Sequence, residues 1–385
     1  MGEMKINPSI FKEYDVRGLY PDEINESAAY ALGGAFAAFL GAQNGGEIAV
    51  GRDGRKSSRP LAQKFIQGAI DAGANVIDIG KTTTPMMYFS VCSLKIAGGA
   101  MITASHNPAK YNGVKFCGER ARPIGGREIK KAVEERKKAK AAAEKGAVRE
   151  KDIKERYLRK VYGDFSMPKK LSFSYSFDKD ADRLIVKDKN GETIRGDLVG
   201  ILVGETAAKK KETVIYDLRC SRSVPNYFRN RGIRAIPCKT GHLNIKNAMR
   251  KHRASFGMEI TGHYYFKKMC YCESPDLALR KLVELVKETK KTPSQLLKPY
   301  EKYHHSGVVN FKIKNLGFGE IRDKLKEKYE NGAVSFMDGI TVEFSNWWFN
   351  LRQSRTEPLL RLAAEANSEK LLAEKIKEIK EIIAS

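Results

Sequence analysis

A serine on a loop behind an apolar strand is the first residue of this sequence that could do chemistry. The apolar run Gly98–Ile102 predicts a buried strand, and the polar residues up to Pro108 cannot easily extend it. Ser105 therefore lies on a sharp loop at a strand end, where open α/β sheets build their sites. Its hydroxyl is either a nucleophile or a loop hydroxyl that bonds its own backbone. Lys115 follows ten residues later and can return to the same place.

Three aspartates alternate with other residues further along the chain. On a strand end or a tight loop, Asp178, Asp180 and Asp182 would aim carboxylate oxygens at one point and repel one another. A divalent cation removes that repulsion, and oxygen-only ligands favour magnesium. The alternative is a solvated acidic turn. The spacing leaves both open, because the remaining residues of a calcium-binding loop are absent.

A third segment combines a carboxylate, a hydroxyl and an imidazole. Glu259, Thr261 and His263 fall at every second residue, so an extended segment would present all three on one side. A carboxylate beside a hydroxyl is suited to gripping adjacent sugar hydroxyls. An ordinary polar strand edge is the alternative.

A fourth segment gathers cations and hydroxyls around a turn. Its polar residues offer a donor set that fits a phosphate dianion, namely Arg352, Ser354, Arg355 and Thr356. The alternative is a basic surface turn. That interpretation fits poorly, because apolar runs lie on both sides of the segment.

Alternating strand and helix patterns predict the elements that position these residues. Strands at Ile48–Asp53, Asn75–Ile79 and Gly98–Ile102, separated by helices, predict two βαβ crossovers and a mostly parallel sheet. Residues 195–302 repeat this theme, and the residues after 305 predict an α+β domain with a closing helix at Ser368–Ile383. The predicted fold class is α/β: repeated mixed, mostly parallel α/β domains around a central cleft, plus a C-terminal α+β domain.

Composition limits the class of protein. The 385 residues carry a net charge of +24, but much of it lies in helical runs with acidic partners, and no nucleic-acid recognition motif accompanies it. We therefore expect a solvated basic surface. No apolar run reaches the roughly 20 residues of a membrane span, and no secretory signal is visible, so we expect a cytoplasmic protein. The six cysteines form no paired C-x-x-C pattern, and we expect reduced, mostly buried thiols.

The four segments, in this order, resemble those of the α-D-phosphohexomutase family, and within it the phosphomannomutases. Further stretches of the sequence share the resemblance, namely Ile10–Gly18, Gly51–Ser58, Thr240–Lys246 and Trp348–Arg352 with Leu359–Glu365. The resemblance implies a phosphoserine loop at Thr103–Pro108, called here the serine loop, and a metal loop at Asp178–Arg183. It also implies a sugar loop at Gly257–His263 and a phosphate loop at Arg352–Pro358.

The resemblance implies a phosphohexomutase that interconverts mannose 1-phosphate and mannose 6-phosphate, with the glucose phosphates as further substrates, through a phosphoserine and a sugar 1,6-bisphosphate. A phosphoglucomutase, a phosphoglucosamine mutase and a non-catalytic sugar-phosphate-binding relative are the alternatives. The implied cofactors are Mg²⁺ and the sugar 1,6-bisphosphate, as activator and intermediate. The implied partners are small phosphosugars, without nucleic acid or membrane, and the implied assembly is a monomer or homodimer.

Family positions assign a role to each candidate residue. The implied catalytic residues are Ser105, Lys115, His106, Arg17, Arg183 and His242, and the implied metal ligands are Ser105, Asp178, Asp180 and Asp182. The implied substrate-binding residues are Glu259, Thr261, His263, Arg352, Ser354, Arg355 and Thr356. Three of these have plainer alternatives: Arg17 as a structural ion-pair partner, His242 as a core histidine and Lys115 as a solvated loop charge.

The sequence departs from the family pattern between the serine loop and the metal loop, where far fewer residues stand than the family leads us to expect. The predicted domains are residues 1–162, 163–194, 195–303 and 304–385. The second of these amounts to about one hairpin, which is below the roughly 40 residues at which a domain core stands alone. We therefore expect it to lean on a neighbouring domain or a partner subunit.

Overall fold

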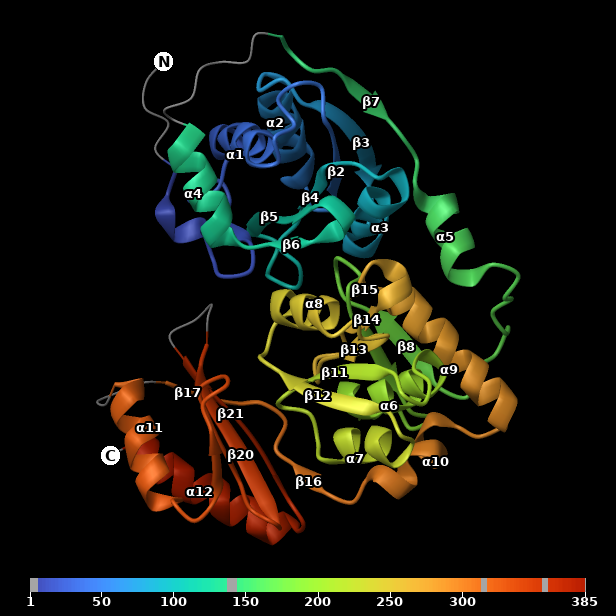
Figure 1. Cartoon of the computed structure of the whole chain (residues 1–385), viewed down its shortest axis with the longest axis vertical. Helices are drawn as coiled ribbons and strands as arrows, with labels where there is room; N and C mark the ends of the chain where they lie inside the picture. Colours follow the sequence, from blue (N-terminus) through green and yellow to red (C-terminus); the bar gives the residue numbers. More distant parts are fainter. Residues whose placement is uncertain (1–5, 137–143, 313–316, 355–358, 385) are drawn as a thin grey trace. The chain divides into compact units, whose positions relative to one another are not determined.

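The computed structural model describes residues 6–136, 144–312, 317–354 and 359–384 (Figure 1). The chain divides into two compact units. The first consists of Met1–Leu171, Tyr175–Ile185 and His263–Val283, and the second of Ser172–Ser174, Val186–Gly262 and Glu284–Ser385. Helices and strands mix in both units, which confirms the predicted α/β class. The central cleft and the division into four domains stay predictions.

A seven-stranded sheet forms the framework of the first unit, in the order β1-β5-β4-β2-β3-β7 with β6 beside β5. Its strands are β1 (Val16–Leu19), β2 (Glu47–Arg52), β3 (Asn75–Lys81), β4 (Gly98–Ile102), β5 (Tyr111–Gly118), β6 (Pro123–Ile124) and β7 (Val148–Glu150). β2 runs parallel to both β3 and β4, and β5 runs antiparallel to β1 and β4. The two predicted βαβ crossovers are therefore confirmed, and the carboxyl ends of β2 and β4 meet at one edge of the sheet.

Helices cover both faces of this sheet (Figure 1). They are α1 (Glu26–Phe39), α2 (Ser58–Ile70), α3 (Thr84–Leu94), α4 (Gly126–Arg136) and α5 (Lys154–Tyr162). On the face of α1 and α2, the rings of Phe36, Phe65 and Phe116 pack with centroids 5.0–6.1 Å apart. On the opposite face, Ala49 of β2 packs in one core with Met87 of α3. Burial on both faces explains why the central strands read as continuous apolar runs.

The second unit contains a parallel α/β part. β11 (Thr213–Asp217) lies between β12 (Arg234–Cys238) and β13 (Phe256–Met258), and all three strands are parallel. The helices along this part are α6 (Gly196–Ala207), α7 (Ser223–Asn230), α8 (His242–Lys251) and α10 (Pro293–Leu297). α9 (Pro275–Thr289) belongs to the first unit as far as Val283. Because α7 joins β11 to β12 and α8 joins β12 to β13, the predicted repeat of the α/β theme is confirmed.

The C-terminal part of the chain forms an antiparallel sheet, as predicted for an α+β domain. The sheet has the order β16-β21-β20-β19-β18, with β17 beside β21. Its strands are β16 (His304–His305), β17 (Val309–Lys312), β18 (Ala333–Ser335), β19 (Ile340–Glu343), β20 (Trp347–Gln353) and β21 (Leu359–Ala366). α11 (Phe318–Lys328) and α12 (Glu369–Ala384) share one apolar core with it.

The predicted short domain, residues 163–194, contains three short strands. They are β8 (Ser174–Phe177), β9 (Leu184–Lys187) and β10 (Thr193–Ile194). β9 and β10 form an antiparallel hairpin. The metal loop connects β8 to β9 and belongs to the first unit, together with the hairpin of β14 (Tyr264–Phe266) and β15 (Cys272–Glu273).

The expectation that all six cysteines are reduced thiols is wrong. Cys92 and Cys270 form a disulfide within the first unit, with their Cα atoms 6.7 Å apart, whereas Cys117, Cys220, Cys238 and Cys272 are buried free thiols. The two bonded residues are 178 positions apart in sequence. Only the packing of α3 against the loop before β15 brings them together, so cysteine spacing could not reveal the pair.

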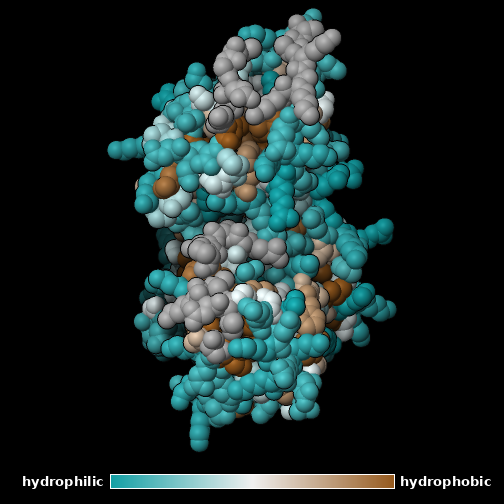
Figure 2. Space-filling model, turned by 90° about the vertical axis from the view of Figure 1, so that its left-hand side faces the viewer, coloured by the Kyte–Doolittle hydropathy of each residue, from teal (hydrophilic) through white to brown (hydrophobic). Residues whose placement is uncertain are grey.

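The surface is rich in charge. Hydrophilic residues predominate on the face in Figure 2, in keeping with a sequence of which 30% is charged. Among the described residues, no helix is long and apolar enough to cross a membrane.

Candidate active site

The serine loop leaves the sheet at the carboxyl end of β4. Ser105 is 3% exposed and has a φ of 52°, in the left-handed region that non-glycine residues seldom adopt. Its Oγ lies 3.4 Å from Nδ1 of His106. Desolvation and the charges of Arg183 and Arg17 lower the pKa of His106 to about 4. The imidazole next to the serine hydroxyl is therefore neutral at neutral pH.

Arg17 reaches the same loop from β1. Its Nη1 donates to Oδ1 of Asn107 at 2.8 Å, and its Nη2 pairs with Asp15. The structural ion pair considered for Arg17 is thus present, but Nε of the same guanidinium is buried without a hydrogen-bond partner among the described residues. A positive group beside the serine loop with one unused donor fits a role toward an anion.

The metal loop turns back on itself between β8 and β9. Asp178 Oδ1 accepts from the backbone N–H groups of Asp182 and Arg183 at 3.1 and 3.2 Å. Oδ2 of Asp180 accepts from Oγ1 of Thr84, the first residue of α3, at 3.0 Å. Asp180 and Asp182 are 1% and 2% exposed, so the solvated acidic turn that the sequence left open does not describe this loop.

The three aspartates fit a divalent cation. One ligand oxygen from each of Asp178, Asp180 and Asp182 lies within 4.8 Å of the others. Oδ1 of Asp180 is buried without a hydrogen-bond partner among the described residues. Oδ2 of Asp178 and Oδ1 of Asp182 are also buried and each faces one basic group, Arg183 Nε at 3.6 Å and His263 Nε2 at 3.2 Å. Burial, and then the charges of Asp182 and Asp180, raise the pKa of Asp178 to about 6. An oxygen-only, negatively charged site of this kind suits Mg²⁺.

Lys115 connects the serine loop to the metal loop. It lies on β5 opposite Met101, near the start of the serine loop. Its Nζ donates to Oδ2 of Asp180 and Oδ2 of Asp182, at 2.6 Å each. Burial would lower the pKa of Lys115, but the two carboxylates outweigh it and raise the pKa. Lys115 is 5% exposed, which rules out the solvated loop charge considered above.

His263 belongs with the metal loop rather than with Glu259 and Thr261. Its Nε2 lies 3.2 Å from both Arg183 Nε and Asp182 Oδ1. Burial would raise the pKa of Asp182, but Lys115 and His263 hold it well below its usual range. The expected extended segment is wrong, because the chain turns at Gly262 (φ 88°), whose N–H donates to Glu259 O at 3.1 Å.

In the second unit, a carboxylate and a histidine meet at the start of α8. Glu259 is 3% exposed, and its Oε1 accepts from the backbone N–H of Gly241 at 2.9 Å. Oγ1 of Thr261 donates to Oε2 of Glu259 at 3.3 Å. His242 is the first residue of α8, directly after Gly241, and is half-buried. The backbone therefore brings together Glu259, Thr261 and His242, which the sequence had assigned to different motifs.

Arg352 and Ser354 lie at the end of β20. Arg352 is 4% exposed, and its Nε is buried without a hydrogen-bond partner among the described residues, 3.9 Å from Oδ2 of Asp338. Burial and the nearby Arg219 lower its pKa. A desolvated guanidinium beside a second cation favours an anionic ligand. Arg355 and Thr356 of the predicted phosphate loop lie outside the described residues.

Sequence analysis missed three residues that hold the two loops of the first unit. Thr84 binds the metal loop, and Asp53 and Arg55 bind the serine loop. All three follow or end an element at the edge where β2 and β4 finish. The available signal for two of them was the opposite charges of Asp53 and Arg55, which directly follow a strand that is too apolar to be exposed.

The sequence matches three domain profiles of one family. Residues 8–143 match the phosphoglucomutase/phosphomannomutase α/β/α domain I, and residues 195–303 match α/β/α domain III. Residues 285–382 match the C-terminal domain of the same proteins. The three profiles leave residues 144–194, which contain the metal loop, between the matched parts.

Individual relatives resemble the chain over nearly its whole length. A phosphomannomutase of Methanocaldococcus jannaschii is 34% identical over 97% of each chain, and one of Vibrio cholerae is 30% identical over 97% of this chain and 98% of its own. A crystal structure of a phosphoglucomutase/phosphomannomutase family protein from Burkholderia thailandensis has a TM-score of 0.87 at 25% identity, covering 98% of both chains. The first alignment spans 444 positions, so some residues of that relative have no counterpart in these 385 residues.

Proposed function

The chain belongs to the phosphoglucomutase/phosphomannomutase family and is an isomerase of the phosphomutase type, and we propose that it interconverts mannose 1-phosphate and mannose 6-phosphate through a phosphorylated Ser105. The mannose assignment rests on the phosphomannomutase relatives at 30–34% identity. The glucose phosphates are proposed as further substrates. We propose a sugar 1,6-bisphosphate as activator and intermediate, and a monomer or homodimer as the assembly.

One observation carries this proposal: the serine loop and the metal loop lie against each other within one compact unit. Lys115 is placed beside the serine loop by β5 and bonds two of the three aspartates. Lys179 of the metal loop contributes a second link, since its Nζ contacts the backbone O of Asn107 at 3.5 Å. The closeness of a hydroxyl, three converging carboxylates and several positive side chains supports a site for phosphoryl transfer.

The proposed reaction has two matched steps. In the first, a sugar hydroxyl oxygen bonds to the phosphorus on Ser105 while the bond from phosphorus to Oγ breaks. The neutral imidazole of His106 takes the hydroxyl proton and returns it to Oγ, and the Lys115 ammonium assists through its charge. The product is a sugar 1,6-bisphosphate. After it turns around, Oγ of Ser105 attacks the other phosphate, which restores the phosphoserine and releases the isomeric monophosphate.

The cation and the positive side chains act on charge in this scheme. We propose that Asp178, Asp180 and Asp182, with an oxygen on Ser105, hold Mg²⁺, which when bound neutralises charge on the transferring phosphoryl group. Arg17 and Arg183 supply further donors from the first unit, and His263, whose Nε2 accepts from Arg183 Nε, lies beside them. Each of these groups gains most when negative charge develops on the phosphoryl oxygens.

The second unit is proposed to hold the part of the substrate that does not react. Glu259 and Thr261 orient sugar hydroxyls, and His242 lies beside them at the start of α8. Arg352 and Ser354, with Arg355 and Thr356, are proposed to bind the second phosphate. The Nε of Arg352 supports this, because it is buried and has no hydrogen-bond partner in the part of the chain that the structure describes, and such a guanidinium favours a phosphate ligand.

Intact mass spectrometry tests the central step. Mixing the purified protein with glucose 1,6-bisphosphate and Mg²⁺ should add one phosphoryl group to the wild-type chain and none to Ser105→Ala. Mannose 1-phosphate should then be converted to mannose 6-phosphate by the wild type alone. An undiminished rate in Ser105→Ala would overturn the proposal, and comparison of kcat/KM for the mannose, glucose and glucosamine phosphates would decide the sugar preference.

A further inference from the structure

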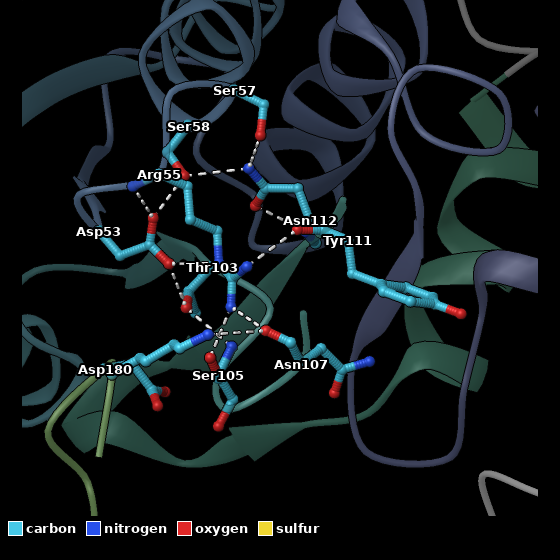
Figure 3. A network of polar contacts seen from close by, with 12 residues as sticks. Asp53, Arg55, Ser57, Ser58, Thr103, Ser105, Asn107, Tyr111, Asn112 and Asp180 are labelled. Carbon is cyan, nitrogen blue, oxygen red and sulfur yellow. Dashed lines mark hydrogen bonds and ion pairs between the residues drawn. The ribbon is translucent and has the colours of Figure 1, made fainter. Parts of the chain in front are cut away.

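Arg55 uses its whole guanidinium on the serine loop and on two residues beside it, Asp53 and Tyr111. Its Nη2 donates to the carbonyl oxygens of Ser105 and Asn107 at 2.7 and 2.9 Å, and its Nη1 to those of Pro108 and Tyr111 at 2.9 and 3.3 Å. Its Nε donates to Oδ2 of Asp53 at 3.0 Å. A guanidinium has five N–H donors, so none remains for a ligand. Figure 3 shows the side chain reaching across to several carbonyls of the loop.

Asp53 is the acceptor at the centre of the same network. Its Oδ2 accepts from Oγ1 of Thr103 at 2.8 Å as well as from Arg55 Nε. Its Oδ1 accepts from Oγ of Ser58 at 2.5 Å and from the backbone N–H of Arg55 at 3.0 Å. Because Asp53 is 4% exposed and the Arg55 side chain 8%, the pair acts in a desolvated setting where hydrogen bonds fix geometry strongly.

The network holds both peptide groups that flank Ser105. The Ser105 N–H donates to Oγ1 of Thr103 at 3.0 Å, and the Ser105 C=O accepts from Arg55. A serine with a φ of 52° persists only where its surroundings fix it in that conformation. This network of Asp53, Arg55 and Thr103, called here the clamp, also fixes the carbonyl of Asn107, whose side-chain Oδ1 accepts from Arg17. The orientation of the Ser105 hydroxyl and that of the Arg17 guanidinium thus depend on the same few contacts.

We propose that Asp53, Arg55 and Thr103 are positioning residues, which hold Ser105 in its left-handed conformation and aim Oγ at the phosphoryl group without touching the substrate. This inference rests on the proposed role of Ser105 as the phosphoryl carrier. Arg55 differs in this respect from Arg17 and Arg352, each of which keeps one buried N–H without a hydrogen-bond partner within the described ranges of the chain. The sequence motif that supplies Asp53 and Arg55 therefore serves the geometry of the nucleophile.

Arg55→Lys tests the clamp, because lysine keeps the charge but cannot reach four carbonyls and a carboxylate at once. We expect kcat to fall about 10- to 100-fold while KM for mannose 1-phosphate changes by less than about threefold. The rate at which glucose 1,6-bisphosphate phosphorylates Ser105, followed by intact mass, should fall in parallel with kcat. Arg59→Lys on the exposed surface of α2 is the matched control and should match the wild type. A raised KM with unchanged kcat, or no change at all, would overturn the proposal.

Thr103 provides a second pair of variants in case Arg55→Lys does not fold. Thr103→Ser keeps the hydroxyl that joins Ser105 to Asp53, whereas Thr103→Val keeps the shape and removes it. We expect a kcat near the wild-type value for Thr103→Ser and a loss of about tenfold for Thr103→Val, with KM little changed. Equal rates for the two variants would contradict a positioning role.

Failure of the clamp and failure of the proposed function give different results. A wild-type protein that glucose 1,6-bisphosphate never phosphorylates would contradict the proposed function itself. Hydrogen exchange would still judge the clamp in that case, because the backbone N–H groups of Ser105, Asn107 and Tyr111 are all hydrogen-bonded. Thr103→Val should speed hydrogen exchange at these amides relative to Thr103→Ser. Equal exchange rates in the two variants would contradict the clamp.

Discussion

The serine loop and the metal loop, neighbours within one compact unit, are held in opposite ways. Thr103 and Arg55 satisfy the backbone groups on both sides of Ser105. In the metal loop, each aspartate keeps a buried oxygen, and that of Asp180 has no hydrogen-bond partner in the part of the chain that the structure describes. Buried polar atoms without partners are costly unless a ligand supplies one. The chain itself therefore completes the first loop, whereas the second loop keeps buried oxygens that the proposed cation would bind.

The largest expected effect comes from Asp178→Asn, which should separate activity from stability. The asparagine oxygen can keep the bonds to the backbone N–H groups of Asp182 and Arg183, so only the charge is lost. We expect turnover at saturating Mg²⁺ to fall about a thousandfold, because the cation supplies several kcal/mol of transition-state stabilisation. In EDTA the free energy of unfolding should equal or exceed that of the wild type, because repulsion among the aspartates is relieved.

Steady-state rates and urea unfolding in EDTA measure the two quantities. Asp188→Asn is the matched control, since Asp188 also accepts backbone N–H bonds in a turn, between β9 and β10, and should keep full turnover. A parallel loss of stability and activity in Asp178→Asn would mean that the metal loop, like the serine loop, is completed by the chain itself.

Asp53→Ala should have the opposite profile, because the serine loop depends on Asp53 with or without a cation. The variant leaves the charge of Arg55 buried and removes the acceptor of Ser58 and Thr103. Breaking a buried ion pair on one side costs about 4 kcal/mol of unfolding free energy. Urea unfolding should show this loss equally in EDTA and in Mg²⁺, and a loss below about 1 kcal/mol would contradict the central place of Asp53.

The sequence predicted the parts of this contrast that depend on local pattern. The apolar run Gly98–Ile102 gave β4, and the loop behind it placed Ser105, because burial on both sheet faces leaves a strong local signal. The alternation of Asp178, Asp180 and Asp182 predicted a converging set of carboxylates, and their oxygens do converge. Short-range spacing sufficed in both cases, since each motif is formed by consecutive residues.

The residues that hold these two motifs in place could not be predicted from the sequence, because each lies far along the chain from the motif that it contacts. Arg55 is 50 residues from Ser105, and Thr84 is 96 residues from Asp180. His263 was grouped with Glu259 by its spacing, but a left-handed glycine, Gly262, turns the chain between them. A Thr-Gly step in that segment was the available hint of a turn.

The disulfide bears on the contrast between the loops, because both of its cysteines lie on segments that support the metal loop, although α3 also packs against β4, the strand that leads to the serine loop. Cys92 lies on α3, the helix that begins at Thr84, and Cys270 follows the strand that begins after His263. Reduction of this bond should lower the free energy of unfolding by about 3 kcal/mol, the middle of the usual range for a disulfide. Dithiothreitol should also weaken Mg²⁺ binding in the folded protein.

Hydrogen exchange can check that selectivity. The amides of Asp182 and Arg183 should exchange faster after reduction, and those of Ser105 and Asn107 should not. The double variant Cys92→Ala with Cys270→Ala should behave like the reduced wild type and ignore dithiothreitol. Equal acceleration in both loops would show that the disulfide supports the whole unit rather than one loop.

Thr84→Val should have the smallest effect, and it tests how strongly the start of α3 holds the metal loop. Thr84 Oγ1 donates to Oδ2 of Asp180, and its backbone N–H donates to the Asp180 carbonyl at 3.1 Å. Valine keeps the shape and the backbone bond, so the variant should lose only the hydrogen bond to the carboxylate, about 1.5 kcal/mol of unfolding free energy in EDTA.

A double-mutant cycle with Asp180→Asn should give a coupling of similar size. The same cycle with Thr83→Val, whose hydroxyl accepts from the Met86 N–H at the start of α3, should give none, because that cap does not touch the loop. A Thr84 coupling no larger than that of Thr83 would mean that the Thr84 hydroxyl does not fix the Asp180 carboxylate, and that Lys115, which donates to the same Oδ2, holds it instead.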